Sequence, residues 1–181
     1  GLSYTISVKP TPQTGLVFSS RKKSSLPKLL DNQSLIQIKA GELGFVKTVG
    51  VKPKKISVGS WPIEKCKFGC DKYGNRGTCP PRSLSPDDMK KLLKDYKKAL
   101  VVFGEPPLEE YQKKLLELEN EAFRQGYVKA LVFSAGPCSL CEDCDVANCR
   151  NPDKARPSLE SCGVDVFDLA KKAGLQLKVL K

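Results

Sequence analysis

The sequence predicts an α/β fold in which a small, mostly parallel sheet has flanking helices and carries cysteine-rich loops at its strand ends. Apolar runs at residues 99–103 and 128–133 flank an amphipathic stretch at residues 108–125. A strand–helix–strand order of this kind normally makes two parallel strands through a right-handed crossover. A dense group of cysteines directly follows the second apolar run. Open α/β sheets bind their ligands at that end of a strand.

The N-terminal part predicts a basic extension or arm at residues 1–34, followed by a cysteine-rich α/β iron–sulfur domain at residues 35–181. Residues 1–30 contain no acidic residue and six serines, a composition typical of transit peptides. The amphipathic helical pattern of such a peptide is missing, however. Tyr4–Val8 and Leu16–Phe18 fit short strands or an extended arm lying on a partner subunit, and a disordered tail is the alternative.

The next part, from residue 35 to residue 58, predicts a small antiparallel β unit. Ile36 and Ile38 alternate with polar residues, and runs typical of strands follow at residues 45–49 and 55–58. Glycines and a proline between these runs indicate turns.

Helices and strands alternate through the rest of the chain. Ser85 predicts an N-cap, because Pro86 fits a first helical turn and the two aspartates that follow favour the positive helix end. A helical turn is expected at residues 158–162, a helix at 164–173 and a last strand at 175–180. The helix at 108–125 is expected to bury one apolar face, made of Leu108, Tyr111, Leu115, Leu118 and Ala122.

Cysteines form the candidate site. Cys138, Cys141 and Cys144 have the C-x-x-C-x-x-C spacing that wraps one compact iron–sulfur core in bacterial ferredoxins, and Cys149 follows one residue later than the usual fourth ligand. A second group lies in a glycine-rich stretch. The chain has eight cysteines, and we expect all of them to bind the metal and its cluster: Cys66, Cys70, Cys79, Cys138, Cys141, Cys144, Cys149 and Cys162.

Two [4Fe–4S] clusters are the expected cofactors. The simplest partition gives the four cysteines at 138–149 to one cluster and Cys66, Cys70, Cys79 and Cys162 to the other. An exchange of one ligand between the clusters, as in ferredoxins, is an alternative. A structural zinc site is the main competing hypothesis. A disulfide scaffold is less consistent with a chain long enough for a hydrophobic core and without a secretory signal.

Composition restricts the partners. Residues 1–82 carry 15 Lys and Arg against 4 Asp and Glu, whereas residues 83–181 carry 16 of each, so the net charge of +11 comes from the first half. This region favours an acidic protein partner or neutralisation of an anionic cluster. Nucleic acid is not the expected partner, because aromatic residues are not interleaved with the basic ones. No apolar run spans a bilayer, and there is no histidine to serve as a general base.

Several motifs together resemble a prokaryotic family of predicted metal-binding, cysteine-rich domains of unknown function (DUF2284). They are Cys70 with Tyr73–Asn75, Cys79 with the two prolines after it, Ala135–Cys144, Cys149–Ser158 and Gly163–Gly174. The resemblance covers about residues 60–180 and implies metal binding in the reducing cytoplasm of an anaerobe. It implies no reaction, and in related sequences the counterpart of Cys162 need not be cysteine.

The expected function is electron transfer by a cytoplasmic iron–sulfur subunit of a larger anaerobic redox complex. A cluster-dependent enzyme with one open iron, suited to sulfur transfer or removal or to dehydration, is the second hypothesis. A zinc-stapled module that binds nucleic acid is the third. Whether the protein is an enzyme stays open, and the sequence identifies no catalytic residue.

Overall fold

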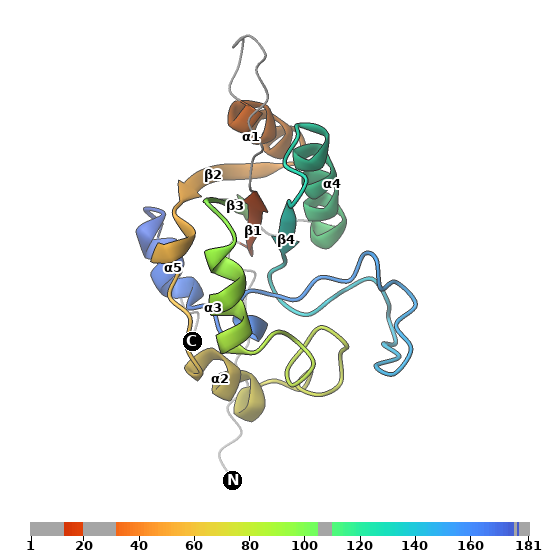
Figure 1. Ribbon diagram of the computed structural model, residues 1–181. Coiled ribbons are helices and arrows are strands. Elements are labelled where there is room, and N and C mark those ends of the chain that lie inside the picture. Colours follow the sequence, from red (N-terminus) through yellow and green to blue (C-terminus); the bar gives the residue numbers. More distant parts are fainter. Residues whose placement is uncertain (1–12, 20–31, 105–109, 176, 178–181) are drawn as a thin grey trace.

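The computed structural model describes residues 13–19, 32–104, 110–175 and 177 (Figure 1). Its centre is a four-stranded sheet of order β2-β3-β1-β4. The strands are β1 (Gln13–Ser19), β2 (Phe45–Val51), β3 (Lys98–Gly104) and β4 (Leu131–Phe133). Each neighbouring pair is antiparallel. The predicted mostly parallel sheet is therefore wrong.

The error has one physical source, the position of β1. The predicted strand–helix–strand unit exists as β3, α4 (Tyr111–Arg124) and β4. Since β1 is antiparallel to both β3 and β4, these two strands point the same way. They are not neighbours, however, because β1 lies between them. Residues 13–19 thus belong to the sheet itself; for residues 1–12 and 20–31, which lie outside the described part, the extension stays a prediction.

The predicted β pattern at Ile36 and Ile38 is also wrong, because these residues lie in helix α1 (Asn32–Glu42). The apolar positions that are buried are Ile36 and Ala40, four residues apart, whereas Ile38 is 52% exposed. A spacing of four places two side chains on one helix face. The predicted strand at 45–49 is confirmed within β2. Residues 55–58 contain the end of the 3₁₀ turn η1 (Pro53–Lys55) and a single bridge from Val58 to Val164.

The other predicted helices are confirmed where the structure describes them. Helix α3 (Pro86–Lys94) has Ser85 as its N-cap residue, and the Ser85 hydroxyl accepts a hydrogen bond from the backbone N–H of Asp88. Helix α4 buries four of the five predicted residues, and the fifth, Leu108, lies outside the described part. The chain continues through the turn η2 (Glu160–Cys162) and helix α5 (Val166–Lys172). The strand predicted at 175–180 falls mostly outside the described residues.

The sheet is buried on both faces, and each face has its own core. Successive residues of β3 alternate between them: Val101 and Phe103 pack with α3 and α5, while Leu100 and Val102 pack with α1 and α4. Figure 1 shows these two pairs of helices on opposite sides of the sheet. None of the described helices is long and apolar enough to span a bilayer.

Candidate metal centre

The cysteines lie in two segments outside the sheet. The first cysteine segment, residues 66–83, starts on helix α2 (Trp61–Gly69), and the second cysteine segment, residues 135–157, follows β4. Both lie at the same end of the molecule, on the α2 side in Figure 1. The prediction that the second group leaves the end of a strand is confirmed.

The second cysteine segment is closed at its base. The backbone N–H of Ser134 donates to the carbonyl of Pro157 over 2.9 Å, and the N–H of Leu159 donates to the carbonyl of Ser134 over 3.1 Å. These bonds form a short parallel bridge between Ser134 and Ser158. The segment therefore leaves and rejoins the core at one point.

Helix α4 holds this segment from the side through the buried side chain of Gln112. Its amide nitrogen donates to the carbonyl of Lys154 over 3.1 Å, and its amide oxygen accepts from the N–H of Ser139 over 3.2 Å. One residue of the helix thus contacts both halves of the segment. Sequence reasoning missed Gln112, because a polar residue next to an apolar face gives no indication of what it contacts.

A carboxylate on the same helix fixes the end of the segment. Glu119 accepts two hydrogen bonds from the guanidinium of Arg156, at 2.5 and 3.2 Å, and one from the backbone N–H of Val132 at 2.6 Å. Both charged side chains are largely buried. Paired bonds of this kind are stronger and more directional than a single neutral bond.

The first cysteine segment starts on a helix, whereas the sequence predicted cysteine-rich loops at strand ends. Cys66 lies on α2 and Cys70 is its C-cap residue, whose N–H donates to the Cys66 carbonyl over 3.1 Å. The Cys70 thiol lies near enough to Cys66 to contribute to the raised pKa of Cys66, although burial is the larger cause. The chain then turns at Gly74, which has a φ of +73°, and the N–H of Cys79 donates to the carbonyl of Arg76.

The two segments are fastened to each other. The guanidinium of Arg76 donates to the carbonyls of Cys141 and Glu142, over 2.8 and 3.0 Å. The next residue, Gly77, donates its backbone N–H to the sulfur of Cys144 over 3.4 Å. Cysteines that lie more than sixty residues apart in the chain are therefore brought to one region.

Polar donors reach two of the thiols. Besides the Gly77 bond to Cys144, the side-chain amide of Asn151 donates to the sulfur of Cys141 over 3.2 Å. Hydrogen bonds to the sulfur of a metal ligand orient that ligand and tune the metal bound to it.

Electrostatics also relates the thiols to each other. Burial raises the pKa of Cys79 to about 11, and the neighbouring thiols of Cys70, Cys66 and Cys138 add to the effect. Burial, with smaller effects of Cys70 and Glu160, raises the pKa of Cys66. Without a bound cation, each thiolate makes ionisation of the neighbouring thiols less favourable. A bound metal cation stabilises the thiolates instead.

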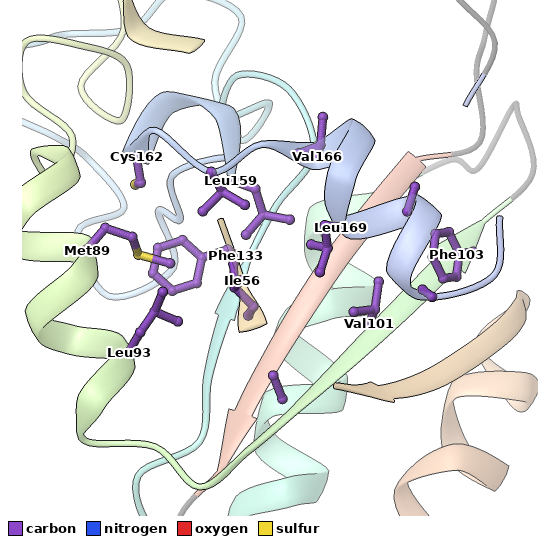
Figure 2. Close-up of a cluster of buried hydrophobic side chains, with 14 residues drawn as sticks. Ile56, Met89, Leu93, Val101, Phe103, Phe133, Leu159, Cys162, Val166 and Leu169 are labelled. Carbon is purple, nitrogen blue, oxygen red and sulfur yellow. The ribbon is translucent and has the colours of Figure 1, made fainter. Parts of the chain in front are cut away.

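Cys162 has different surroundings. It is fully buried in the core that contains Met89, Leu159 and Phe133 (Figure 2). Burial raises its pKa to about 11, and the hydroxyl of Ser161 lies 3.8 Å from its sulfur. The ligand role of Cys162 stays a prediction.

Three buried side-chain polar atoms of the described residues have no hydrogen-bond partner. They are the hydroxyls of Thr78 and Tyr111 and one carboxylate oxygen of Glu160. Thr78 precedes Cys79, and the carboxylate of Glu160 acts on both Cys66 and Tyr111. Unpartnered buried polar atoms are rare in folded proteins. Sequence reasoning missed all three, because it considered only cysteines.

A comparison with known proteins identifies the family to which this chain belongs. Among the described residues, no three Cys, Asp or Glu side chains converge closely enough to hold a single metal ion. No curated protein and no solved structure is significantly similar to the chain. The model of a family described as predicted metal-binding proteins (DUF2284) matches residues 50–181, which include every cysteine. The chain therefore belongs to this family of predicted metal-binding proteins.

Proposed function

We propose that the two cysteine segments bind two [4Fe–4S] clusters and that the protein transfers electrons within a larger anaerobic redox complex. The observation that carries this proposal is the direct fastening of one cysteine segment to the other through Arg76 and Gly77. Two groups of thiols that the fold holds next to each other suit a relay, because electrons pass efficiently only between nearby centres. When bound, such clusters supply one-electron exchange.

The donor set fits iron and sulfide. All the cysteines are free thiols, and the chain has no histidine to complete a mixed zinc site. The Gly77 N–H and the Asn151 amide, both directed at cysteine sulfurs, are the kind of donor that tunes cluster potentials. Cys66, Cys70 and Cys79 would hold one cluster, and Cys138, Cys141, Cys144 and Cys149 the other.

The surface beside the first cysteine segment supports an acidic protein as the partner. Phe68 is 80% exposed on α2 and is followed closely by the exposed Cys70. Lys67 lies 5.3 Å from the Phe68 ring and Lys65 lies 6.0 Å from the ring of Trp61. Exposed aromatic rings surrounded by cations match a partner face that is apolar at its centre and acidic at its rim.

A second candidate function is catalysis at an open iron. The burial of Cys162 in the apolar core favours it, because the first cysteine segment then has only three thiols for a four-iron cluster. An iron without a thiolate can bind a substrate as a Lewis acid.

Purification under strict exclusion of oxygen tests the proposal. We expect brown protein with about eight iron and eight sulfide per chain, and an EPR signal after reduction by dithionite. Colourless protein that contains zinc, or cysteines joined as disulfides, would refute it. Replacing Cys141 by serine is expected to remove one cluster, whereas replacing Ser139 by alanine, two residues away, is expected to leave both.

A further inference from the structure

One carboxylate oxygen of Glu160 is buried without a hydrogen-bond partner on an element that packs against α2. Glu160 lies on η2, which packs against α2, the helix that carries Cys66. The residue as a whole is half-buried, but its Oε2 atom is inaccessible and has no hydrogen-bond partner. Burial of a carboxylate oxygen without a partner is strongly unfavourable, and buried carboxylates in folded proteins are paired or bind metal ions.

In the described part of the chain, Glu160 interacts electrostatically with a thiol and with no basic side chain. Its carboxylate acts electrostatically on Cys66, Cys162 and Tyr111. Burial raises the pKa of Glu160, and only its own backbone N–H and Ser158 oppose the effect. No basic side chain of the described residues is among the groups that act on it.

The alternatives for a fourth ligand beside Cys66, Cys70 and Cys79 are less favourable. The Cys162 sulfur belongs to the apolar core, where Cys162 packs with Met89, Leu159 and Phe133. Cys138 does act on Cys79, but its own segment offers it three other thiols at ferredoxin spacing.

We propose that Glu160 is the fourth ligand of the metal centre of the first cysteine segment, where it binds iron through its unpartnered carboxylate oxygen. The assignment rests on the proposed function, since it presupposes a cluster held by Cys66, Cys70 and Cys79. On binding, the three thiols and the carboxylic acid release their protons to solvent, and four metal–ligand bonds form. A carboxylate is a harder ligand than a thiolate. The iron at Glu160 is therefore the position where an external ligand exchanges most readily.

Iron counting on point variants tests the ligand assignment. In Glu160→Gln, which keeps the shape but removes the anionic oxygen, we expect bound iron to fall by about half, because one of two clusters is lost. Glu160→Cys restores an anionic ligand and is expected to retain the full iron content with a changed EPR spectrum. Cys162→Ala and the surface control Glu117→Gln, whose carboxylate pairs with Lys39 on α1, are expected to retain all iron and the wild-type spectrum.

The outcomes separate this assignment from the proposed function. If wild-type protein carries iron and Cys66→Ser loses about half of it, the cluster binding on which the proposed function depends is supported. If Glu160→Gln then keeps full iron and an unchanged spectrum, or if Cys162→Ala or Cys138→Ser loses the same cluster as Cys66→Ser, the assignment of Glu160 is overturned. If wild-type protein carries no iron at all, the proposed function itself fails. Circular dichroism of each variant confirms that it folds, and Glu160→Cys decides the matter should Glu160→Gln not fold.

Discussion

Replacing Gln112 by leucine removes the two hydrogen bonds by which α4 holds the second cysteine segment, and keeps nearly the same side-chain volume. The lost bonds join the Gln112 amide to the Lys154 carbonyl and to the Ser139 N–H. Because α4 keeps its own apolar contacts through Leu115 and Leu118, we expect the segment to loosen while the helix stays in place.

The expected size follows from the two bonds. Each neutral hydrogen bond contributes about 0.5–1.5 kcal/mol net. Both partner residues in the segment are exposed, so water replaces Gln112 on the freed N–H and carbonyl, and the larger penalty for buried unpaired groups does not apply. The sum is about 2 kcal/mol, which raises the open fraction of the segment about 30-fold, because 1.4 kcal/mol corresponds to a factor of ten.

Amide hydrogen exchange measured by mass spectrometry checks this expectation. Peptides from residues 135–157 should exchange about 30-fold faster in the variant, while peptides from β3 should not change. Gln125→Leu is the matched control, since the Gln125 amide donates to Glu121 of the same helix over 2.6 Å. Unchanged exchange at residues 135–157, or equal acceleration in β3, would show that Gln112 does not anchor the segment.

Three further predictions concern the metal, a closely packed glycine and an ion pair. Removal of the metal by a chelator should open the second cysteine segment to proteases while the sheet stays resistant, because bound metal contributes about 10–16 kcal/mol to such segments; uniform resistance of the metal-free protein would contradict this. Gly163→Ala should lower the free energy of unfolding, measured in urea, by more than about 2 kcal/mol. Gly163 has a φ of +82°, and a Cβ there would lie 2.5 Å from the Gly59 carbonyl oxygen. Gly126→Ala is the control and should lower this free energy less, because Gly126 also has a positive φ, +87°, but no atom lies near the added Cβ. Asp168→Asn should destabilise the protein at neutral pH but not in acid, because the hydrogen bond from Lys172 lowers the pKa of Asp168. The stability that the Asp168 carboxylate contributes is therefore present above the unfolded pKa of about 3.9 and is lost as the pH falls through the folded pKa. An equal loss of stability in urea denaturation at both pH values would refute the role of this ion pair.

Local chemistry predicted several elements correctly. The N-cap at Ser85 and the spacing of Tyr111, Leu115 and Leu118 depend only on residues within one or two turns, so helices α3 and α4 follow from the sequence. The apolar run of β3 is equally local. The β prediction at Ile36 and Ile38 failed because a period of two fits these residues over a short window. In helix α1 the buried residues are instead Ile36 and Ala40, four positions apart.

The arrangement of the sheet and of the site depends on long-range contacts. No local pattern indicates that residues 13–19 lie between two strands that follow about eighty and about a hundred and fifteen residues later. Likewise, cysteine spacing indicated two thiol groups but not the contacts of Arg76 and Gln112 that hold them. Glu160 had no distinguishing sequence pattern at all, and only its burial next to α2 draws attention to it.

The position of β1 between β3 and β4 matters for the expression of a shortened protein that contains only the residues matched by the family. A polypeptide that starts at residue 50 keeps every cysteine but lacks the inner strand and most of β2. Strands β3 and β4 would then expose unpaired backbone N–H and C=O groups, which can pair with strands of other molecules. Insoluble material from such a shortened version would report on a missing partner strand rather than on the chemistry of the thiols.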